Sequence, residues 1–256
     1  MGGGLIRGWV ASGQMPAQNL VAVDLVDSVL APLRALGVET TQDLAAAVQN
    51  CDVIVCGLKP QSAAPVLKKL GGSIGQDQIL ASIMAGTPTA QIEAQVETPV
   101  PVVRVMPQML AAIGQAASAL CGGRHAEPRH VDLVRSLFNL VGSTVVVTEE
   151  QMDAVTGLSG SGPAYVYTII EALSDGGVRV GLPRDVAFTL AAQTVMGAAR
   201  MTLESDLHPA ALKEQITSPG GTTIAGLHKL EEKGLRDALI SAVEAACQRS
   251  IELGRR

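Results

Sequence analysis

The sequence is poor in the residues that mark several classes of protein. Aromatic residues make up 2% of its 256 residues, so the interior must be built mainly from aliphatic side chains. Apolar residues reach 47%, enough for a large core, which we expect to be divided between two domains. The net charge is -5 and the charges are scattered, whereas binding of nucleic acid requires a basic face. We therefore expect no nucleic-acid partner.

Cysteine and histidine are scarce and dispersed. The four cysteines lie far apart except for Cys51 and Cys56, whose spacing is wider than that of a CxxC motif. Reduced structural thiols are the simpler interpretation, with metal or redox chemistry as the alternative. The four histidines show no HExxH or other ligand spacing, so the sequence predicts no metal site.

Long apolar runs and targeting signals are also missing. Gly, Pro or a charge interrupts each apolar run well short of the roughly 18 residues that a membrane span requires. No cationic segment followed by an apolar one opens the chain as a signal peptide would. These absences predict a soluble, cytoplasmic protein without a membrane partner.

The first half of the chain alternates between two periodicities. Short apolar runs predict strands at residues 20–23, 52–57, 79–83, 100–105, 117–121 and 145–147. Helical patterns at residues 28–36 and 43–49 separate the first two runs. Such alternation is typical of a doubly wound parallel sheet, so residues 1–148 are predicted to form an α/β domain.

After Glu149 the strand signal stops and Ala- and Leu-rich helical patterns take over. They cover residues 162–176, 184–205, 210–216 and 223–256. Gly181 marks a helix end and Pro183 the next helix start. Residues 149–256 are therefore predicted to form an all-helical domain. Because a small helical domain with much apolar surface often buries it against another subunit, we expect a homodimer unit, with a higher oligomer as an alternative.

Three stretches rich in glycine or hydroxyl groups carry the candidate chemistry. Residues 2–4 (GGG) precede a helical pattern, as in a dinucleotide fold, but no strand precedes them, so a frayed end is the alternative. LSGSGPAYVY (residues 158–167) and ITSPGGTTIAGL (residues 216–227) place small residues and hydroxyls directly before a helix. Exposed N–H groups at such a helix start suit a carboxylate, and a merely capped helix is the alternative.

Long stretches of the chain resemble the pyrroline-5-carboxylate reductase family. They are MDAVTGLSGSGPAYVY, GLPRDVAFTLAAQTVMGAARM and HPAALKEQITSPGGTTIAGLHKLEEKGLRDALISAVEAA. In the first half, CGLKPQ, SIMAG and PVVRVMPQML are similar to the family's AVKPQ, SIAAG and PVVRVMPNTP. The resemblance implies a Rossmann-like dinucleotide-binding domain followed by a helical substrate and dimerisation domain. It also implies reduction of a cyclic imine, 1-pyrroline-5-carboxylate, to L-proline, with NADP or NAD as cofactor.

On this alignment Met1 falls on the methionine that closes the family's GxGNM turn. We therefore expect the first strand and the glycine turn to lie upstream of residue 1. Residues 2–4 would then form the first turn of the helix that faces the phosphates.

The resemblance places the substrate pocket in the ITSPGGTTIAGL turn. The residues implied to hold the ring carboxylate are Ser218, Gly220, Gly221, Thr222 and Thr223. Thr223 is the candidate catalytic residue, because its hydroxyl would hydrogen-bond the ring nitrogen. Glu149 and Asp206 are candidate acids near the substrate, with a solvated surface charge as the alternative for each.

The candidates for the cofactor site follow strands or begin helices, except for one in the helical domain. They are Gly2, Gly3, Asp24, Leu58, Lys59, Pro60, Met84, Ala85, Gln108 and Gln215. Open α/β sheets bind ligands at the carboxyl ends of their strands, although for Lys59 an exposed strand-end lysine is the alternative. Asp24 would accept a hydrogen bond from a ribose 2′-OH, which favours NADH, and the loop after it offers Asp27 and Ser28. Gln108 stands where the family has the Asn of Asn-Thr-Pro.

Three functions are compatible with these features. The first is an imine reductase that produces L-proline, and the second is a related reductase of a hydroxy acid or an amine. The third is a non-catalytic relative that keeps the helical dimer and the carboxylate pocket but binds nucleotide poorly. A hydroxy-acid enzyme would need a lysine or similar acid-base group facing the nicotinamide, whereas the two motifs supply hydroxyls. This disfavours the second function. The imine reductase is our prediction, with the non-catalytic relative as the alternative.

Overall fold

The computed structural model describes residues 1–96 and 98–254, apart from the side chains of residues 60 and 61. The chain forms two compact units. The first comprises Met1–Gly160 and Ala246–Arg256, and the second comprises Ser161–Ala245. The domain division between residues 148 and 149 stays a prediction.

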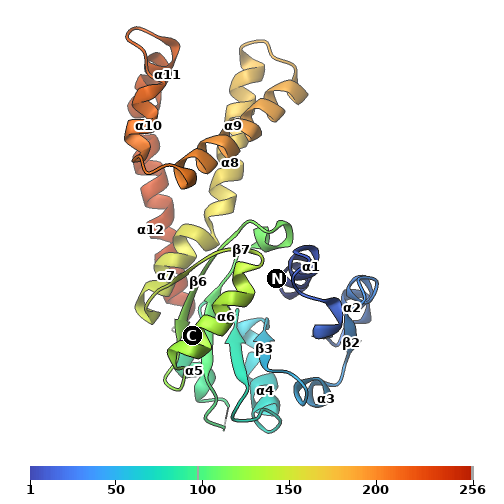
Figure 1. Ribbon diagram of the computed structural model, residues 1–256. Helices are drawn as coiled ribbons and strands as arrows, with labels where there is room; N and C mark the ends of the chain where they lie inside the picture. Colours follow the sequence, from blue (N-terminus) through green and yellow to red (C-terminus); the bar gives the residue numbers. More distant parts are fainter. Residues whose placement is uncertain (97, 255–256) are drawn as a thin grey trace. The chain divides into compact units, whose positions relative to one another are not determined.

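The first unit contains two sheets, drawn in Figure 1. A small parallel pair is formed by β1 (Val21–Val23) and β2 (Glu39–Thr41). The larger sheet has five strands in sequence order: β3 (Val53–Cys56), β4 (Ile79–Ser82), β5 (Val102–Met106), β6 (Ala116–Gly122) and β7 (Gly142–Val146). The predicted α/β class is confirmed.

One strand pair departs from the predicted parallel sheet. Strands β3, β4 and β5 run parallel to one another, as do β6 and β7, but β5 and β6 are antiparallel. Residues 107–115 connect β5 to β6 through the short helix η2 (Met109–Ile113). A parallel crossover needs a dozen or more residues, so this connection is too short for one.

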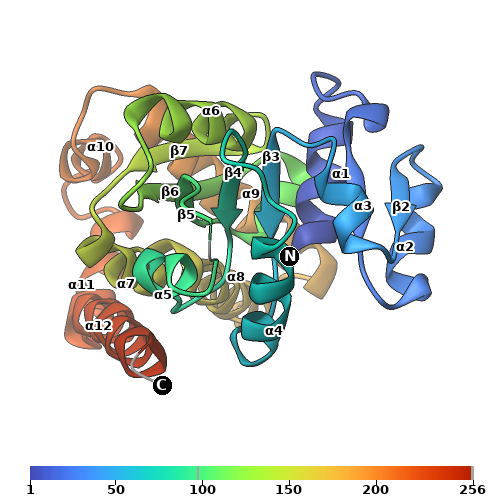
Figure 2. The same ribbon diagram turned by 90° about the horizontal axis from the view of Figure 1, so that it is seen from below.

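Helices cover both faces of the larger sheet. They and the other helical segments of this unit are α1 (Gly2–Ala11), η1 (Ala17–Asn19), α2 (Asp27–Arg34), α3 (Leu44–Val48), α4 (Pro60–Gly71), α5 (Thr89–Glu93), α6 (Pro128–Asn139), η3 (Glu149–Gln151), α7 (Met152–Val155) and η4 (Thr156–Gly160). Figure 2 shows α6 on one side of the sheet and α4 and α5 on the other. The ring of Trp9 in α1 meets that of Phe138 in α6 edge to face, with 5.8 Å between centroids. This arrangement is the Rossmann-like fold predicted from the sequence.

The second unit is helical, as predicted. Its helices are α8 (Gly162–Arg179), α9 (Arg184–Glu204), α10 (Pro209–Gln215), α11 (Thr222–Glu232) and α12 (Leu235–Gly254), the last of which continues into the first unit. The single helical segment predicted from residue 223 onward is divided at Gly234, whose φ of 71° ends α11 in the left-handed region. None of the helices in residues 1–96 and 98–254 is long and apolar enough to cross a membrane.

Candidate active site

The amino end of α1 lies beside the carboxyl end of β3. A Cβ on Gly57, which directly follows β3, would lie 3.9 Å from the backbone nitrogen of Gly2. Among the residues that the structure describes, no side chain caps α1, and a Cβ on Gly2 would meet no atom within 4 Å. As the first residues of the helix, Gly2 and Gly3 leave their N–H groups without an intrahelical partner. Two open N–H groups at the positive end of a helix dipole fit the pyrophosphate of a dinucleotide.

The strand-end candidates lie where β3 and β4 end. Leu58 and an exposed Lys59 follow β3, and Met84 and Ala85 follow β4. Pro60 is the first residue of α4, and its side chain lies outside the described residues. Because β3 and β4 are neighbouring parallel strands, these segments meet at one edge of the sheet, as predicted.

Asp24 and Gln108 differ in how far their side chains are already engaged. Asp24 directly follows β1, and its Oδ1 accepts the N–H of Val26 at 2.9 Å. Gln108 is 8% exposed, its Oε1 accepts the N–H of Ala117 at 3.0 Å, and its Nε2 donates to the Ser159 carbonyl oxygen. The Gln108 side chain therefore ties η4 to β6, and its contact with a cofactor stays a prediction.

Glu149 lies in a polar cluster with side chains from α5, β5 and β6. Its Oε1 accepts from Nη1 of Arg104 at 2.5 Å, and its Oε2 accepts from the Thr89 hydroxyl at 2.8 Å and from the Cys121 thiol at 3.4 Å. Burial alone would raise the pKa of Glu149, but the bonds from Arg104 and Thr89 outweigh it and hold that pKa below its usual value. The alternative of a solvated surface charge is therefore wrong for Glu149.

Arg104 was not among the sequence candidates. It lies within an apolar run that predicts a buried strand, and its side chain is 4% exposed. A lone charge inside such a run was the signal, because a buried guanidinium requires a partner carboxylate. Asp206, the other candidate acid, lies exposed in the bend between α9 and α10.

In the second unit, residues 218–221 form a tight turn between α10 and α11. The N–H of Gly221 donates to the Ser218 carbonyl oxygen at 3.1 Å. Pro219 occupies the second position, and Gly220 occupies the third with a φ of 68°. This is the residue pattern of a type II turn, which requires positive φ at its third position. A Cβ on Gly221 would lie 2.3 Å from the Ser218 hydroxyl oxygen, so a side chain there would force that hydroxyl to move.

The turn leaves the amino end of α11 open. Gly221 is the N-cap residue and has no side chain to bond the first helical N–H groups. The N–H groups of Thr222 and Thr223 belong to the first turn and have no intrahelical partner, whereas the N–H of Ala225 already donates to the Gly221 carbonyl oxygen at 3.4 Å. Thr222 is exposed and Thr223 is half-buried. Gln215, the candidate cofactor contact in this unit, is the exposed last residue of α10.

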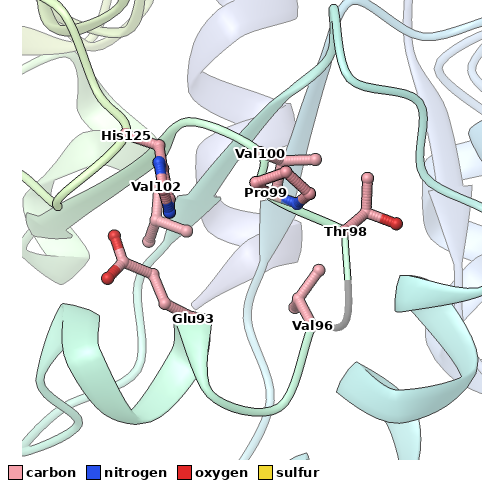
Figure 3. Close-up of a pocket in the computed structure, with 7 residues that line it drawn as sticks. All are labelled: Glu93, Val96, Thr98, Pro99, Val100, Val102 and His125. Carbon is pink, nitrogen blue, oxygen red and sulfur yellow. The ribbon is translucent and has the colours of Figure 1, made fainter.

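A separate cavity in the first unit contains none of the candidate residues. Its volume is about 140 Å³, and it is lined by Glu93, Val96, Thr98, Pro99, Val100, Val102 and His125. Figure 3 shows Glu93 and His125 on one side of the cavity and Thr98 on the other. The Glu93 carboxylate already accepts the N–H of Arg124 at 2.7 Å. This cavity is therefore not part of the candidate site.

Two family comparisons match different parts of the chain. Residues 149–253 match the family described as pyrroline-5-carboxylate reductase dimerisation. Residues 1–86 match the family described as NADP oxidoreductase, coenzyme F420-dependent. The two matches fall on the helical and the α/β parts of the sequence.

Whole-length relatives carry one name. A pyrroline-5-carboxylate reductase of Methanosarcina acetivorans is 43% identical, over 100% of this chain and 95% of the relative. One of Pisum sativum is 42% identical, over 97% of this chain and 91% of the relative.

Solved structures of similar proteins agree over nearly the whole chain. A pyrroline carboxylate reductase of Plasmodium falciparum with NADP bound is 31% identical with a TM-score of 0.87, covering 99% of this chain and 94% of that chain. A pyrroline-5-carboxylate reductase of Coxiella burnetii is 32% identical with a TM-score of 0.91, covering 98% of this chain and 93% of that chain.

Proposed function

The chain belongs to the pyrroline-5-carboxylate reductase family, and from this premise we propose that it reduces 1-pyrroline-5-carboxylate to L-proline with NAD(P)H. This is the function predicted from the sequence motifs. The observation that supports it most directly is the glycine turn of residues 218–221, which leaves open N–H groups at the start of α11. Such a helix start suits the ring carboxylate of the substrate.

We propose that the turn binds and orients the imine ring. The N–H groups of Thr222 and Thr223 bind the carboxylate, and the Ser218 hydroxyl donates a further hydrogen bond. Gly220 and Gly221 allow the close turn that brings these donors together. The Thr223 hydroxyl lies one residue inside the helix, where its oxygen accepts a hydrogen bond from the protonated ring nitrogen.

The reaction needs orientation and a proton on the imine nitrogen. When bound, the reduced nicotinamide supplies a hydride, which adds to the imine carbon while the C=N π pair passes to nitrogen. Protonation of the ring nitrogen makes the C=N bond a better hydride acceptor, and the product is the neutral ring amine of proline. The protein contributes by holding the ring in reach and by fixing the iminium N–H.

The cofactor site is proposed on the first unit. The open N–H groups of Gly2 and Gly3 bind the pyrophosphate, and the segments after β3 and β4 line the nucleotide. Gln215 in the second unit stays a predicted contact. Because Arg104 and Thr89 already hold the Glu149 carboxylate, the structure supports a structural role for it, and its contact with the substrate stays a prediction.

We further propose that two copies of the chain pair through the helical unit. An apolar groove of about 820 Å³ between α8 and α9 is lined by Tyr167, Ile170, Glu171, Ser174, Asp175, Arg184, Phe188 and Ala192. Phe188 is 57% exposed in the single chain. Several other large apolar side chains of this unit are exposed as well. A second copy that covers this face would remove that surface from water. A higher oligomer and a cytoplasmic location remain predictions.

Sedimentation velocity tests the dimer. The wild-type chain is expected to sediment as a dimer or a multiple of it, and Phe188→Arg is expected to shift it toward monomer. Leu133→Arg, on the exposed face of α6 in the first unit, is the matched control and should leave the mass unchanged. A wild-type monomer, or an equal effect of the two variants, would contradict this pairing.

The reaction is tested by following oxidation of NADH and NADPH in the presence of the cyclic imine, with L-proline identified as the product. Thr223→Ala is expected to lower kcat/KM about tenfold to a hundredfold, because it removes a hydrogen bond to the reacting ring. Thr202→Ala is the control, since the Thr202 hydroxyl donates to the Ala198 carbonyl oxygen within its own helix, α9. Failure to form proline with either nucleotide would favour the non-catalytic relative. An equal effect of the two variants on kcat/KM would show that the Thr223 hydroxyl takes no part in the reaction.

A further inference from the structure

We propose that this chain prefers NADH to NADPH and that Asp24 sets the preference. The inference rests on the proposed function, because it concerns which nicotinamide nucleotide the same site takes. NADPH differs from NADH only by a phosphate on the 2′-oxygen of the adenosine ribose. In folds of this type, an acidic residue about 20 residues after the glycine turn accepts a hydrogen bond from that 2′-OH, and a nearby arginine accommodates a 2′-phosphate.

Asp24 directly follows β1, the strand that comes after α1, and its backbone is hydrogen-bonded to β2. Val23, the last residue of β1, pairs with Thr41 of β2, and the N–H of Asp24 donates to the Thr41 carbonyl oxygen at 3.4 Å. Its Oδ1 accepts the N–H of Val26 at 2.9 Å, which fixes the side chain as well. Its Oδ2 has no hydrogen-bond partner among the residues that the structure describes. One oxygen of a fixed carboxylate is thus free to accept from a ribose hydroxyl.

No free cation faces Asp24 from its own loop. The loop sequence DLVDS (residues 24–28) contains no lysine or arginine. Arg34, at the end of α2, is engaged twice: it contacts Asp27 Oδ1 at 2.9 Å, and its Nε donates to the Thr40 hydroxyl at 3.0 Å. The charges of Arg34 and Asp27 offset each other, which leaves the negative charge of Asp24. A 2′-phosphate, with close to two negative charges, would be repelled by it.

Arg7 of α1 is a basic residue that could offset this repulsion, but its position argues against that. It is exposed on α1, and its Nη1 lies 3.6 Å from where a Cβ on Gly3 would stand. This places the guanidinium at the first turn of α1, beside the N–H groups proposed for the pyrophosphate. NADH and NADPH share the pyrophosphate, so Arg7 is expected to strengthen the binding of both without distinguishing them.

The test measures dissociation constants of NADH and NADPH for the full chain by calorimetry at one ionic strength. The wild type is expected to bind NADH about tenfold or more tightly than NADPH, as repulsion of about 1.4 kcal/mol would produce. Asp24→Ser and Asp24→Asn remove the negative charge and are expected to narrow this ratio by about the same factor. Arg7→Gln is the matched control and is expected to weaken both nucleotides by similar factors. Thermal unfolding without nucleotide verifies that each variant is folded.

The contrary results separate a failure of this inference from a failure of the proposed function. A wild type that binds NADPH as tightly as NADH or more tightly would overturn the inference, and so would Asp24 variants that leave the ratio unchanged. Selective loss of NADPH binding in Arg7→Gln would also overturn it, because Arg7 would then hold the 2′-phosphate. If the imine is still reduced in any of these cases, the proposed function stands. Binding of neither nucleotide would overturn both this inference and the proposed function.

Discussion

The guanidinium of Arg104 lies 2.5 Å from the carboxylate of Glu149 and joins the centre of the sheet to the segment that begins the helical part of the sequence. Arg104 stands on β5 between Ser82 of β4 and Cys121 of β6. Its side chain is buried, and its Nη2 has no hydrogen-bond partner among the described residues. A buried charge with so few partners depends on its one carboxylate.

Removing the charge of Glu149 should therefore destabilise the fold. Glu149→Gln leaves the buried Arg104 without a counter-charge and is expected to lower the free energy of unfolding by about 3 kcal/mol. Urea denaturation measures this change. Glu150→Gln alters the charge of the neighbouring exposed residue and should have no measurable effect. Equal stability of the two variants would show that the ion pair contributes little.

The same ion pair predicts a pH dependence. The pKa of Glu149 lies below its ordinary value of 4.5 in the folded chain, so folding favours the ionised form. The resulting stability is fully present above the unfolded pKa and is lost as the pH falls through the lower folded pKa. Between about pH 6 and pH 3, the wild type should thus lose more stability than Glu149→Gln. A difference between the two proteins that stays constant over this range would contradict the prediction.

Two buried thiols should be unreactive in the native protein. Burial raises the pKa of Cys56 to about 11. The pKa of Cys121 is raised to about 12, mainly by burial and secondly by the negative charge of the nearby Glu149 carboxylate. At pH about 8 the reactive thiolate form of both is therefore rare. Iodoacetamide labelling followed by mass spectrometry should modify the half-buried Cys247 before either of them, whereas unfolded protein should be labelled at all positions. Rapid labelling of Cys121 in the native state would be contrary to this burial.

Elements governed by local patterns could be predicted from the sequence. Strands β3 and β4 coincide with apolar runs, and the turn at residues 218–221 follows from its Pro-Gly-Gly sequence. Strand β2 was missed because Glu39–Thr41 is polar and joins the fold through backbone bonds to β1. The end of α11 at Gly234 was missed because the flanking sequence favours helix on both sides.

Contacts between distant residues could not be predicted. Arg104 and Glu149 are far apart in the chain, and no local pattern indicates that they meet. Gln108 likewise bridges Ala117 and Ser159, so a residue interpreted as a cofactor contact has structural bonds of its own. The antiparallel β5–β6 pair depended on the length of a connection, which the apolar pattern of the strands does not report.

Gly220 and Gly226 provide a matched pair of glycines on the two sides of the proposed carboxylate site. Gly220 has a φ of 68°, and Gly226 lies within α11, where an added Cβ meets no atom within 4 Å. Gly220→Ala is expected to lower the free energy of unfolding by about 1 kcal/mol, because a side chain disfavours the left-handed region. Gly226→Ala is expected to raise it by a similar amount, of the order of 0.5–1 kcal/mol, because alanine is the better helix former.

The same two variants separate a structural role of the turn from a role in binding. If residues 218–221 position the N–H groups that hold the carboxylate, Gly220→Ala should also raise KM for the imine, since the altered turn misplaces those donors. Gly226→Ala lies a full turn beyond the open N–H groups and should leave KM unchanged. Steady-state kinetics with the imine as the varied substrate, together with urea denaturation, measures both quantities. Loss of stability in Gly220→Ala with an unaltered KM would mean that the turn ends α10 and begins α11 without binding the substrate.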